Sequence, residues 1–524
     1  MRDPFTKLRF VIASVAKQST VSINPIAYGL PRRCAPRNDG LVQGVLHKKP
    51  PLFFRFASSR LAAACSLAFL AFLAFLAGCS ATPVVMNPPM AAAGIADADR
   101  INRLPNRKSA TSPQRTTIVL AFSGGGTRTA ALSYGVLKGL RDVPLPGQPG
   151  RRLLDEVDAI SAVSGGSFTA AYYALKGDAI FEDYEGKFLK ADIEKELKDN
   201  IFSLAHVFSR QSRSQKAMAV YDKHLFGGAH FSDLTRPNSP VLIINASDLG
   251  QGARFSYTQE YFDLLCSDLA PVPISQAVTA SSAVPLVFSP VLLKNYQGCQ
   301  TRTAKAINRL AAKDDLPAPM AHNLAILQRY GEHERAQYLH LIDGGVTDNL
   351  GLRALYDLIA AHGGPATFWQ RLDRPAPRRF VIVSVDGMRS SDLQLDASAE
   401  APSILNTVQA VTDMQMDRYS ADTLNMVGES AKHWVQQWSR PGAPVELYFL
   451  HLHFRQLQDA RLRDALYLIP TALTLPAPQV DELINTGEHL LRSNLEFKRL
   501  LRDLGASPAE LKAASLPGVA NPSK

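Results

Sequence analysis

The sequence predicts an α/β fold with a mostly parallel central sheet flanked by helices in three layers, and with extra C-terminal helices. Predominantly apolar runs at 118–122, 240–245 and 379–386 are typical of buried strands, and helical patterns lie between them. Apolar strands that alternate with helices are typical of a parallel sheet covered on both faces. The 524 residues, 46% of them hydrophobic and 20% charged, suffice for one large core with additions or for two domains.

The net charge of +10 belongs to the beginning of the chain. Residues 1–78 contain eleven Lys or Arg and two Asp or Glu, which leaves 46 of the 57 basic and 45 of the 47 acidic residues for the remainder. The folded part is therefore close to neutral, and the composition gives no support to nucleic-acid binding.

The first part of the chain has the order of an export leader. Residues 1–44 lack a helical period and a hydrophobic run, so we interpret them as lying upstream of the true start. Residues 47–78 hold basic residues and then an apolar run that ends in Leu-Ala-Gly before Cys79. This order resembles the bacterial lipobox, which implies a lipoprotein signal and lipidation of Cys79, and Ser80 beside it favours the outer membrane. A plain transmembrane anchor is the alternative, because 18 residues without charge could just span a membrane.

Residues 79–115 are predicted to be a lipidated tether. The segment after Pro83 is rich in Pro, Ala, Asn and Arg and has no periodic apolar face. The protein would then be attached by a lipid anchor in the bacterial cell envelope. We expect it on the outer membrane, facing the periplasm.

A glycine loop follows the first predicted strand. The run at 118–122 breaks into Ser-Gly-Gly-Gly-Thr-Arg, which places Gly124, Gly125, Gly126 and Arg128 directly before a helical pattern. Backbone N–H groups of such a loop can converge on an anion, and the helix N-terminus adds partial positive charge. The sequence therefore predicts an oxyanion hole here. A nucleotide-binding loop is not supported, since neither the required lysine nor the third glycine stands at the required spacing.

Ser164 lies on a predicted strand-turn-helix elbow. An apolar run ends at Ser164, two glycines follow, and a helix-forming segment begins at Phe168. An elbow of this kind exposes the hydroxyl and needs small residues two positions before and after the serine, which are Ala162 and Gly166 here. Asp343 ends another predicted strand and is followed by two glycines, so its carboxylate could act as the general base for Ser164.

These motifs resemble the patatin-like phospholipase family in kind and in order. The matching blocks are Gly124-Gly125-Gly126-x-Arg128, the Ser164 elbow, the segment 280–290 (Ala-Ser-Ser-Ala-Val-Pro-Leu-Val-Phe-Ser-Pro) and Asp343-Gly-Gly. The departures are Ser123, Thr129 and Ala162, none of which removes a reacting group. The resemblance implies the patatin-like fold and a Ser-Asp dyad hydrolase with phospholipase A or lysophospholipase activity through an acyl-enzyme. In such a hydrolase Arg128 could either fix the glycine loop or contact a lipid phosphate.

Other chemistries have less support. Twelve histidines would allow a Ser-His-Asp triad, but His340 and Asp343 differ by three positions on one strand and so point to opposite faces. His451 and His453 also lie on a predicted strand, where histidines are most often structural. The sequence contains no His-Glu-x-x-His and no Cys-x-x-Cys, so no metal is expected, and no cofactor is indicated.

Cysteine usage agrees with export. Without the leader, and with Cys79 acylated, only Cys266 and Cys299 remain. In an oxidising periplasm the two are expected to form a disulfide that closes a loop of about 33 residues, worth roughly 3–4 kcal/mol in the chain-entropy model.

The remaining segments complete one globule. Residues 116–395 form the predicted hydrolase domain, in which 300–337 is a charged, helical, solvent-facing insertion. Residues 396–517 are expected to be a mainly helical extension, with a helix over 401–426, a strand over 446–453 and a closing helix over 480–504, and 518–524 is a tail.

Two functions remain open at this stage. The first is a membrane-anchored lipid acyl hydrolase whose substrate is a membrane phospholipid or lysophospholipid. The second is a catalytically weak or inactive envelope lipoprotein that keeps the fold and binds or passes lipids. The departures from the family pattern at Ser123, Thr129 and Ala162 favour this second function. The sequence does not indicate the head group, the acyl position, transacylase chemistry or the oligomeric state.

Overall fold

The computed structural model divides the chain into two compact units, Met1–Leu76 and Ala77–Lys524. Every helix and strand described below lies in the second unit, which therefore has a complete core of its own. The predictions for the leader, for Cys79 and for the tail lie outside the described residues. The structure describes residues 84–90, 115–202, 211–313, 316, 318–332, 334–362, 364–372, 375–389 and 399–507.

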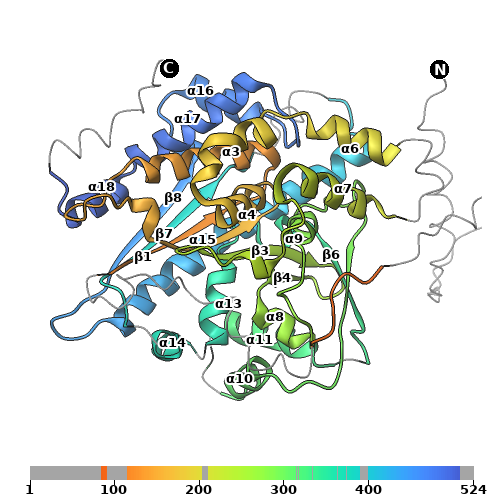
Figure 1. Ribbon diagram of the computed structural model, residues 1–524, viewed down its shortest axis with the longest axis horizontal. Helices are drawn as coiled ribbons and strands as arrows, with labels where there is room; N and C mark the ends of the chain where they lie inside the picture. The colour runs from red at the N-terminus through yellow and green to blue at the C-terminus, as the bar shows by residue number, and fades with distance from the viewer. Residues whose placement is uncertain are drawn as a thin grey trace, which may run out of the picture. The chain divides into compact units, whose positions relative to one another are not determined.

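An eight-stranded sheet organises the molecule (Figure 1). Its order is β5-β6-β3-β2-β1-β7-β8, and β4 also pairs with β3. The five strands from β3 to β8 along this order are parallel, whereas β4, β5 and β6 are antiparallel additions at one edge. The predicted fold class is thereby confirmed. The strands are β1 (Thr116–Phe122), β2 (Val157–Val163), β3 (Val241–Asp248), β4 (Ala253–Tyr257), β5 (Val291–Lys294), β6 (Tyr338–Ile342), β7 (Arg379–Asp386) and β8 (Glu446–His453).

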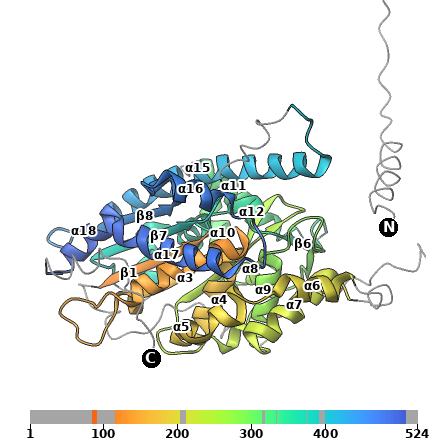
Figure 2. The same cartoon turned by 90° about the horizontal axis from the view of Figure 1, so that it is seen from above.

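Helices cover both faces of the sheet. The α-helices are α3 (Gly126–Arg141), α4 (Gly165–Lys176), α5 (Ile180–Tyr184), α6 (Ile193–Phe202), α7 (Arg213–Tyr221), α8 (Gln259–Leu264), α9 (Ile274–Ser281), α10 (Arg302–Ala311), α11 (Ala318–Arg329), α12 (Gly345–Asp348), α13 (Arg353–Ala361), α14 (Pro365–Arg371), α15 (Ile404–Trp438), α16 (Ala460–Leu468), α17 (Ala477–Ser493) and α18 (Leu495–Asp503). Figure 2 shows α15 and α5 on opposite sides of the sheet.

Strand β1 shows why the sheet is covered on both sides. All seven of its residues are buried, and neighbouring side chains belong to different apolar clusters. Ile118 and Leu120 pack in the cluster that contains α3, α4 and α17, whereas Val119 and Ala121 pack in the cluster that contains α13 and the second half of α15. This alternation follows from the two-residue period of a strand.

The C-terminal extension is part of the same globule. Strand β8 completes the sheet beside β7, and α17 packs along α3. The two helices approach closely because glycines face each other's backbone, and a Cβ at Gly135 would lie 2.0 Å from the Ile484 carbonyl oxygen. The single helix predicted over 480–504 is instead α17 and α18. Asn494 has an extended backbone, and its side chain accepts from the N–H groups that begin α18, so the first helix ends there.

The predicted insertion at 300–337 contains α10 and α11. Contrary to the expectation of a solvent-facing segment, Ile307, Leu310 and Leu324 are buried in the main apolar cluster. The reason is that each helix has one apolar face, which packs on the globule while its charged residues face water.

Part of the predicted tether is bound to the globule. Residues 84–90 lie along the outer edge of β5, where the Met86 N–H donates to the Leu292 carbonyl. The Asn87 side chain exchanges two hydrogen bonds with the Lys294 backbone, and the Met90 N–H donates to the Cys266 carbonyl. The edge of β5 is thereby covered by this segment, which satisfies backbone groups that an edge strand would otherwise expose.

Candidate active site

Ser164 occupies a sharp turn between β2 and α4. Its backbone angles are φ 47° and ψ −120°, a conformation that non-glycine residues rarely adopt. The turn is possible because the next two residues have no side chain. A Cβ at Gly165 would lie 2.0 Å from the Gly126 carbonyl oxygen, and one at Gly166 would lie 2.7 Å from the Ser123 carbonyl oxygen. This strained elbow is the geometry expected of a reactive serine.

The Ser164 hydroxyl donates to Asp343. The distance from Ser164 Oγ to Asp343 Oδ2 is 2.8 Å, and the two residues are separated by 179 positions in the sequence. Ser164 is 7% exposed and Asp343 is 8% exposed, so the pair lies just below the surface. The structure therefore brings together the two residues that the sequence assigned as nucleophile and base.

Asp343 is held by backbone groups on either side. The Gly345 N–H donates to Asp343 Oδ1 at 2.8 Å, and the Asp343 N–H donates to the Ala283 carbonyl at 2.9 Å. A Cβ at Gly344 would lie 2.2 Å from the Asn245 carbonyl oxygen, so the residue after Asp343 packs directly on β3. These contacts fix the carboxylate in the orientation that faces Ser164.

Burial changes the acidity of this carboxyl group. Desolvation raises the pKa of Asp343 from 3.8 to about 6, although the hydrogen bonds from Gly345 and Ser164 act in the opposite direction. The carboxylate is still mostly ionised at neutral pH. A pKa close to the operating pH is what an efficient general base requires.

The glycine loop lies against Ser164, but its first glycine is not a free donor. A Cβ at Gly124 would lie 3.4 Å from Ser164 Cβ, while the Gly124 N–H donates to the Asn349 carbonyl at 3.0 Å. The prediction that Gly124 donates to an oxyanion is therefore corrected. Gly125 and Gly126 both have positive φ, and Gly126 begins α3, where the first N–H groups have no acceptor within the helix. The N–H groups of Gly125 and Gly126 are therefore the remaining candidate donors to an oxyanion.

Arg128 is buried and connects the glycine loop to distant segments of the chain. Its Nε donates to the Gly387 carbonyl at 2.6 Å and its Nη1 to the Ile469 carbonyl at 2.7 Å, while Nη2 reaches Thr471 Oγ1 at 3.1 Å. Burial, together with the positive charge of Arg389, lowers the pKa of Arg128 to about 9. Because the guanidinium is covered and its donors are engaged, contact with a lipid phosphate is not its role. It ties the glycine loop to the segment after α16.

Thr129, a departure from the family pattern, supports the same loop. Its hydroxyl donates to the Gly124 carbonyl at 2.8 Å. Ser123 fulfils a related function, because its hydroxyl accepts the Gly387 N–H at 3.0 Å. The Thr127 N–H donates to the Ala472 carbonyl, so the C-terminal extension also contacts the start of α3. The extension therefore helps to hold the candidate oxyanion hole.

Sequence reasoning missed one residue that connects both members of the dyad. This residue is Ser281, the last residue of α9. Its Oγ accepts a hydrogen bond from the Ser164 N–H at 2.8 Å and donates one to the Asn245 carbonyl at 2.6 Å. Its own carbonyl accepts the Gly344 N–H. The segment 280–290 was recognised as a motif, but only the folded chain shows that it holds the serine and the aspartate together.

The histidines lie elsewhere. His340 is on β6 with its side chain exposed, while the rings of His451 and His453 stack at 4.6 Å on β8. Burial lowers the pKa of both β8 histidines to about 4, so they are neutral at pH 7. In the described part of the chain, no histidine hydrogen-bonds to Ser164 or Asp343, which leaves the triad without support.

Cys266 and Cys299 form a disulfide, with their Cα atoms 5.5 Å apart. It joins the end of α8 to the segment after β5, beside the docked residues 84–90. Among the described residues, no group of three or more His, Cys, Asp or Glu side chains could hold a metal ion. In the same part of the chain, no helix is long and apolar enough to cross a bilayer.

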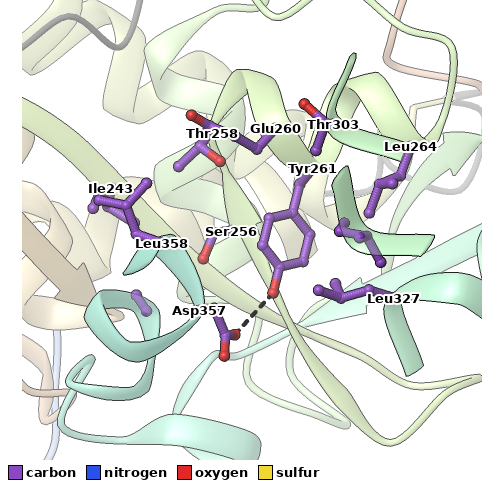
Figure 3. A pocket seen from close by; sticks show the side chains of 12 residues that line it. Ile243, Ser256, Thr258, Glu260, Tyr261, Leu264, Thr303, Leu327, Asp357 and Leu358 are labelled. Carbon is purple, nitrogen blue, oxygen red and sulfur yellow. Dashed lines mark hydrogen bonds between the residues drawn. The ribbon is translucent and has the colours of Figure 1, made fainter. Parts of the chain in front are cut away.

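A separate pocket lies between β3, β4, α8, α10, α11 and α13 (Figure 3). Tyr261 points into it and donates to Asp357 Oδ2 at 3.2 Å. Asp357 also pairs with the buried Arg254. Neither the dyad nor the glycine loop lines this pocket, so it is not the site built around Ser164.

One family model matches the part of the chain that contains the candidate site. The family model for patatin-like phospholipase matches residues 120–356, which include the glycine loop, the elbow and Asp343. No curated protein sequence matches the chain. Human GIVD cytosolic phospholipase A2 is similar at a TM-score of 0.41 and 13% identity, over 82% of this chain and 67% of that one. Its complex with methyl gamma-linolenyl fluorophosphonate gives a TM-score of 0.35 and 15% identity, over 83% and 66%. At these TM-scores neither similarity supports a conclusion about the function of this chain.

Proposed function

We propose that this chain, whose residues 120–356 match the patatin-like phospholipases, is a membrane-anchored serine lipid acyl hydrolase of the phospholipase A or lysophospholipase type. The observation that carries the proposal is the 2.8 Å hydrogen bond from Ser164 Oγ to Asp343 Oδ2 on a strained elbow. A hydroxyl aimed at a buried carboxylate with a raised pKa is the arrangement of an activated nucleophile.

Acylation begins when Asp343 takes the Ser164 proton as Oγ attacks the ester carbonyl carbon. The carbonyl oxygen becomes an oxyanion, which the Gly125 and Gly126 N–H groups stabilise. Removal of one donor in such a hole typically costs about 10²–10³ in rate. The tetrahedral intermediate collapses, the C–O bond of the ester breaks, and Asp343 returns the proton to the departing alcohol.

Deacylation repeats these steps with water. Asp343 takes a proton from the water that attacks the acyl carbon, the bond to Ser164 Oγ breaks, and the proton returns to that oxygen. A fatty acid leaves and the enzyme is regenerated. No group beyond the dyad and the loop is required, because one carboxylate can serve as base and acid in turn.

Anchoring at Cys79 is the second part of the proposal. A lipidated cysteine would be stably held in a bilayer, since each buried CH₂ contributes about 0.8 kcal/mol. We expect the chain in the outer membrane of a bacterial envelope, facing the periplasm. Incorporation of a labelled fatty acid into the protein, lost in Cys79→Ser, tests the anchor. A labelled Cys79→Ser variant would contradict it.

The experiment that tests the enzymatic part uses residues 80–524. Release of fatty acid from mixed micelles of phospholipid or lysophospholipid is compared with Ser164→Ala and Asp343→Asn. Each substitution should lower the rate at least about a hundredfold, the scale of removing a reacting group. Circular dichroism checks that the variants are folded. Equal rates, or no release from either lipid class, would favour a lipoprotein that binds or passes lipids.

A further inference from the structure

We propose that four exposed apolar side chains beside the dyad, Val284, Leu286, Val287 and Val346, form the surface with which the protein seats on a lipid bilayer. We call this set the apolar rim. The inference rests on the proposed function and extends it, because it assigns the surface through which a lipid substrate would be approached.

The apolar rim is joined to Asp343 from both sides. The Ala283 carbonyl accepts the Asp343 N–H at 2.9 Å, and Val284 is the next residue. On the other side, Val346 follows Gly345, whose N–H holds the Asp343 carboxylate, and the Val346 N–H approaches the Asp343 carbonyl at 3.4 Å. A surface that bound the apolar rim would therefore lie at the edge of the catalytic pair.

These side chains are unusually open to solvent. Val284 is 41% exposed, Leu286 71%, Val287 50% and Val346 42%, and Pro285 between the first two is exposed as well. Single exposed apolar residues are common, but contiguous ones on one short loop indicate a contact surface.

The loop that carries three of them is held in shape. Leu286 has a φ of 72°, which is costly for a residue with a side chain. Phe288, which follows the exposed residues, is buried, and its N–H donates to the Val284 carbonyl at 3.0 Å. This hydrogen bond closes the loop, and the buried Phe288 side chain fixes the end of the loop to the protein. The first turn of α7 supports the loop, because Arg213 Nη1 donates to the Leu286 carbonyl at 2.8 Å. The backbone thus presents Leu286 outward instead of folding it in.

The docked segment 84–90 connects the predicted lipid anchor at Cys79 with the end of β5 that the apolar loop enters. Met86 bonds to Leu292 and Asn87 to Lys294, so this segment and β5 run in the same direction, and Val84 lies toward the beginning of β5. The apolar loop enters β5 at that same end. Val84 is itself exposed.

Chain length then limits how far the apolar rim can be from a lipid on Cys79. Five residues from Cys79 to Val84 span at most about 18 Å. A lipid on Cys79 would consequently hold this end of β5, and the loop that leads into it, close to the membrane surface. The Arg213 guanidinium at the base of the loop suits the phosphate groups found at that surface.

A second copy of the chain is the less fitting occupant. Stable protein interfaces bury about 1,200–2,000 Å² in total, and four side chains provide only a small part of this area. A dimer formed here would also cover Val284 and Val346, whose neighbours Ala283 and Gly345 bond to Asp343. A bilayer needs no such area, because insertion of a few apolar side chains adds to the anchor already present.

The test measures vesicle binding of residues 80–524, which lack the lipid anchor. The protein carries Ser164→Ala so that no lipid is consumed, and vesicles of phosphatidylcholine with phosphatidylglycerol are separated by flotation. Replacing both Leu286 and Val287 by Ser should lower the partition coefficient at least about tenfold, since each fully inserted side chain corresponds to about that factor. The matched control is Leu495→Ser, which removes an equally exposed leucine on α18, 79% exposed, and should change binding less than about twofold.

Several outcomes would overturn the proposal. Equal flotation of the double variant and its parent, an equal loss in the control, or no vesicle binding by the parent would each do so. So would a dimer in sedimentation velocity that the double substitution dissociates. If the double variant does not fold, Val346→Ser alone is used, with a loss of several-fold expected. Flotation of an inactive chain does not depend on hydrolysis, so failure of the proposed enzymatic function is seen separately.

Discussion

In the proposed mechanism, the raised pKa of Asp343 makes the acylation step pH dependent. Only the ionised carboxylate can accept the Ser164 proton, and burial raises the pKa of Asp343 from 3.8 to about 6. With that pKa, about 97% of the groups are ionised at pH 7.5 and about 9% at pH 5.0. The acylation rate should therefore fall about tenfold between these two values, with its midpoint at about pH 6.

The assay follows the reaction of Ser164 with a fluorophosphonate in excess. Ser164 Oγ displaces fluoride from phosphorus, so the rate reports the base-assisted attack of the serine without a later hydrolysis step, and the reagent does not ionise in this range. The apparent first-order rate constant of residues 80–524 is recorded from pH 5.0 to 8.0. A carboxylate with an unshifted pKa would still be about 94% ionised at pH 5.0, so its profile would be almost flat.

The same shift predicts a change in stability with the opposite sign to that of a salt-bridged aspartate. Between the unfolded pKa of 3.8 and the folded pKa of about 6, the native state holds a proton that the unfolded state releases. The free energy of unfolding therefore falls as pH rises, and the Asp343 contribution falls by about 1.4 kcal/mol from pH 5.0 to 7.5. Asp343→Asn lacks this contribution, so the variant should gain stability relative to wild type by about that amount over the same interval.

Two results would be incompatible with a raised pKa of Asp343. One is a flat rate profile down to pH 5.0 while circular dichroism reports a folded protein. The other is a difference in unfolding free energy between Asp343→Asn and wild type, from urea titrations, that stays constant from pH 5.0 to 7.5. Either result would mean that the Asp343 carboxyl is not desolvated as its burial in the structure requires.

Three further predictions concern the parts that hold the site. Gly165→Ala should lower the unfolding free energy by about 1–3 kcal/mol and abolish most activity, because its methyl group would enter the backbone of the glycine loop. Gly186→Ala, where a methyl group meets nothing within 4 Å, is the control, and equal melting temperatures for the two variants would contradict the packing argument. Arg128→Met should lower the rates on a neutral ester and on a phospholipid by the same factor, since it leaves buried carbonyls unpaired, whereas a loss confined to the phospholipid would indicate a phosphate contact. Reduction of Cys266 and Cys299 should lower the unfolding free energy by about 3–4 kcal/mol, and two thiols that alkylate freely in the native protein would exclude the disulfide.

The local geometry of the site could be predicted from the sequence because its causes are local. A serine followed by two glycines at a strand end permits a sharp turn, because glycine has no Cβ to collide with the neighbouring backbone, and the elbow at Ser164 is such a turn. The carboxylate at the end of β6 could be assigned for a similar reason, since Asp343 is followed by glycines that let the chain pack on β3.

The supporting contacts could not be predicted, because they join residues far apart in the sequence. Arg128 bonds to Ile469, 341 positions away, and Ser281 accepts from Ser164 across 117 positions. No periodicity or motif encodes such pairs. The antiparallel edge formed by β4, β5 and β6 is likewise set by tertiary pairing, since β5 has only four residues and gives little signal of its own.

Activation of Ser164 by Asp343 can be measured by labelling with a fluorophosphonate, followed by peptide mass spectrometry. In residues 80–524 we expect one adduct, on Ser164, no adduct in Ser164→Ala, and labelling slowed at least about a hundredfold in folded Asp343→Asn. An adduct on another serine, or equal labelling rates in wild type and Asp343→Asn, would mean that Ser164 is not a nucleophile activated by Asp343.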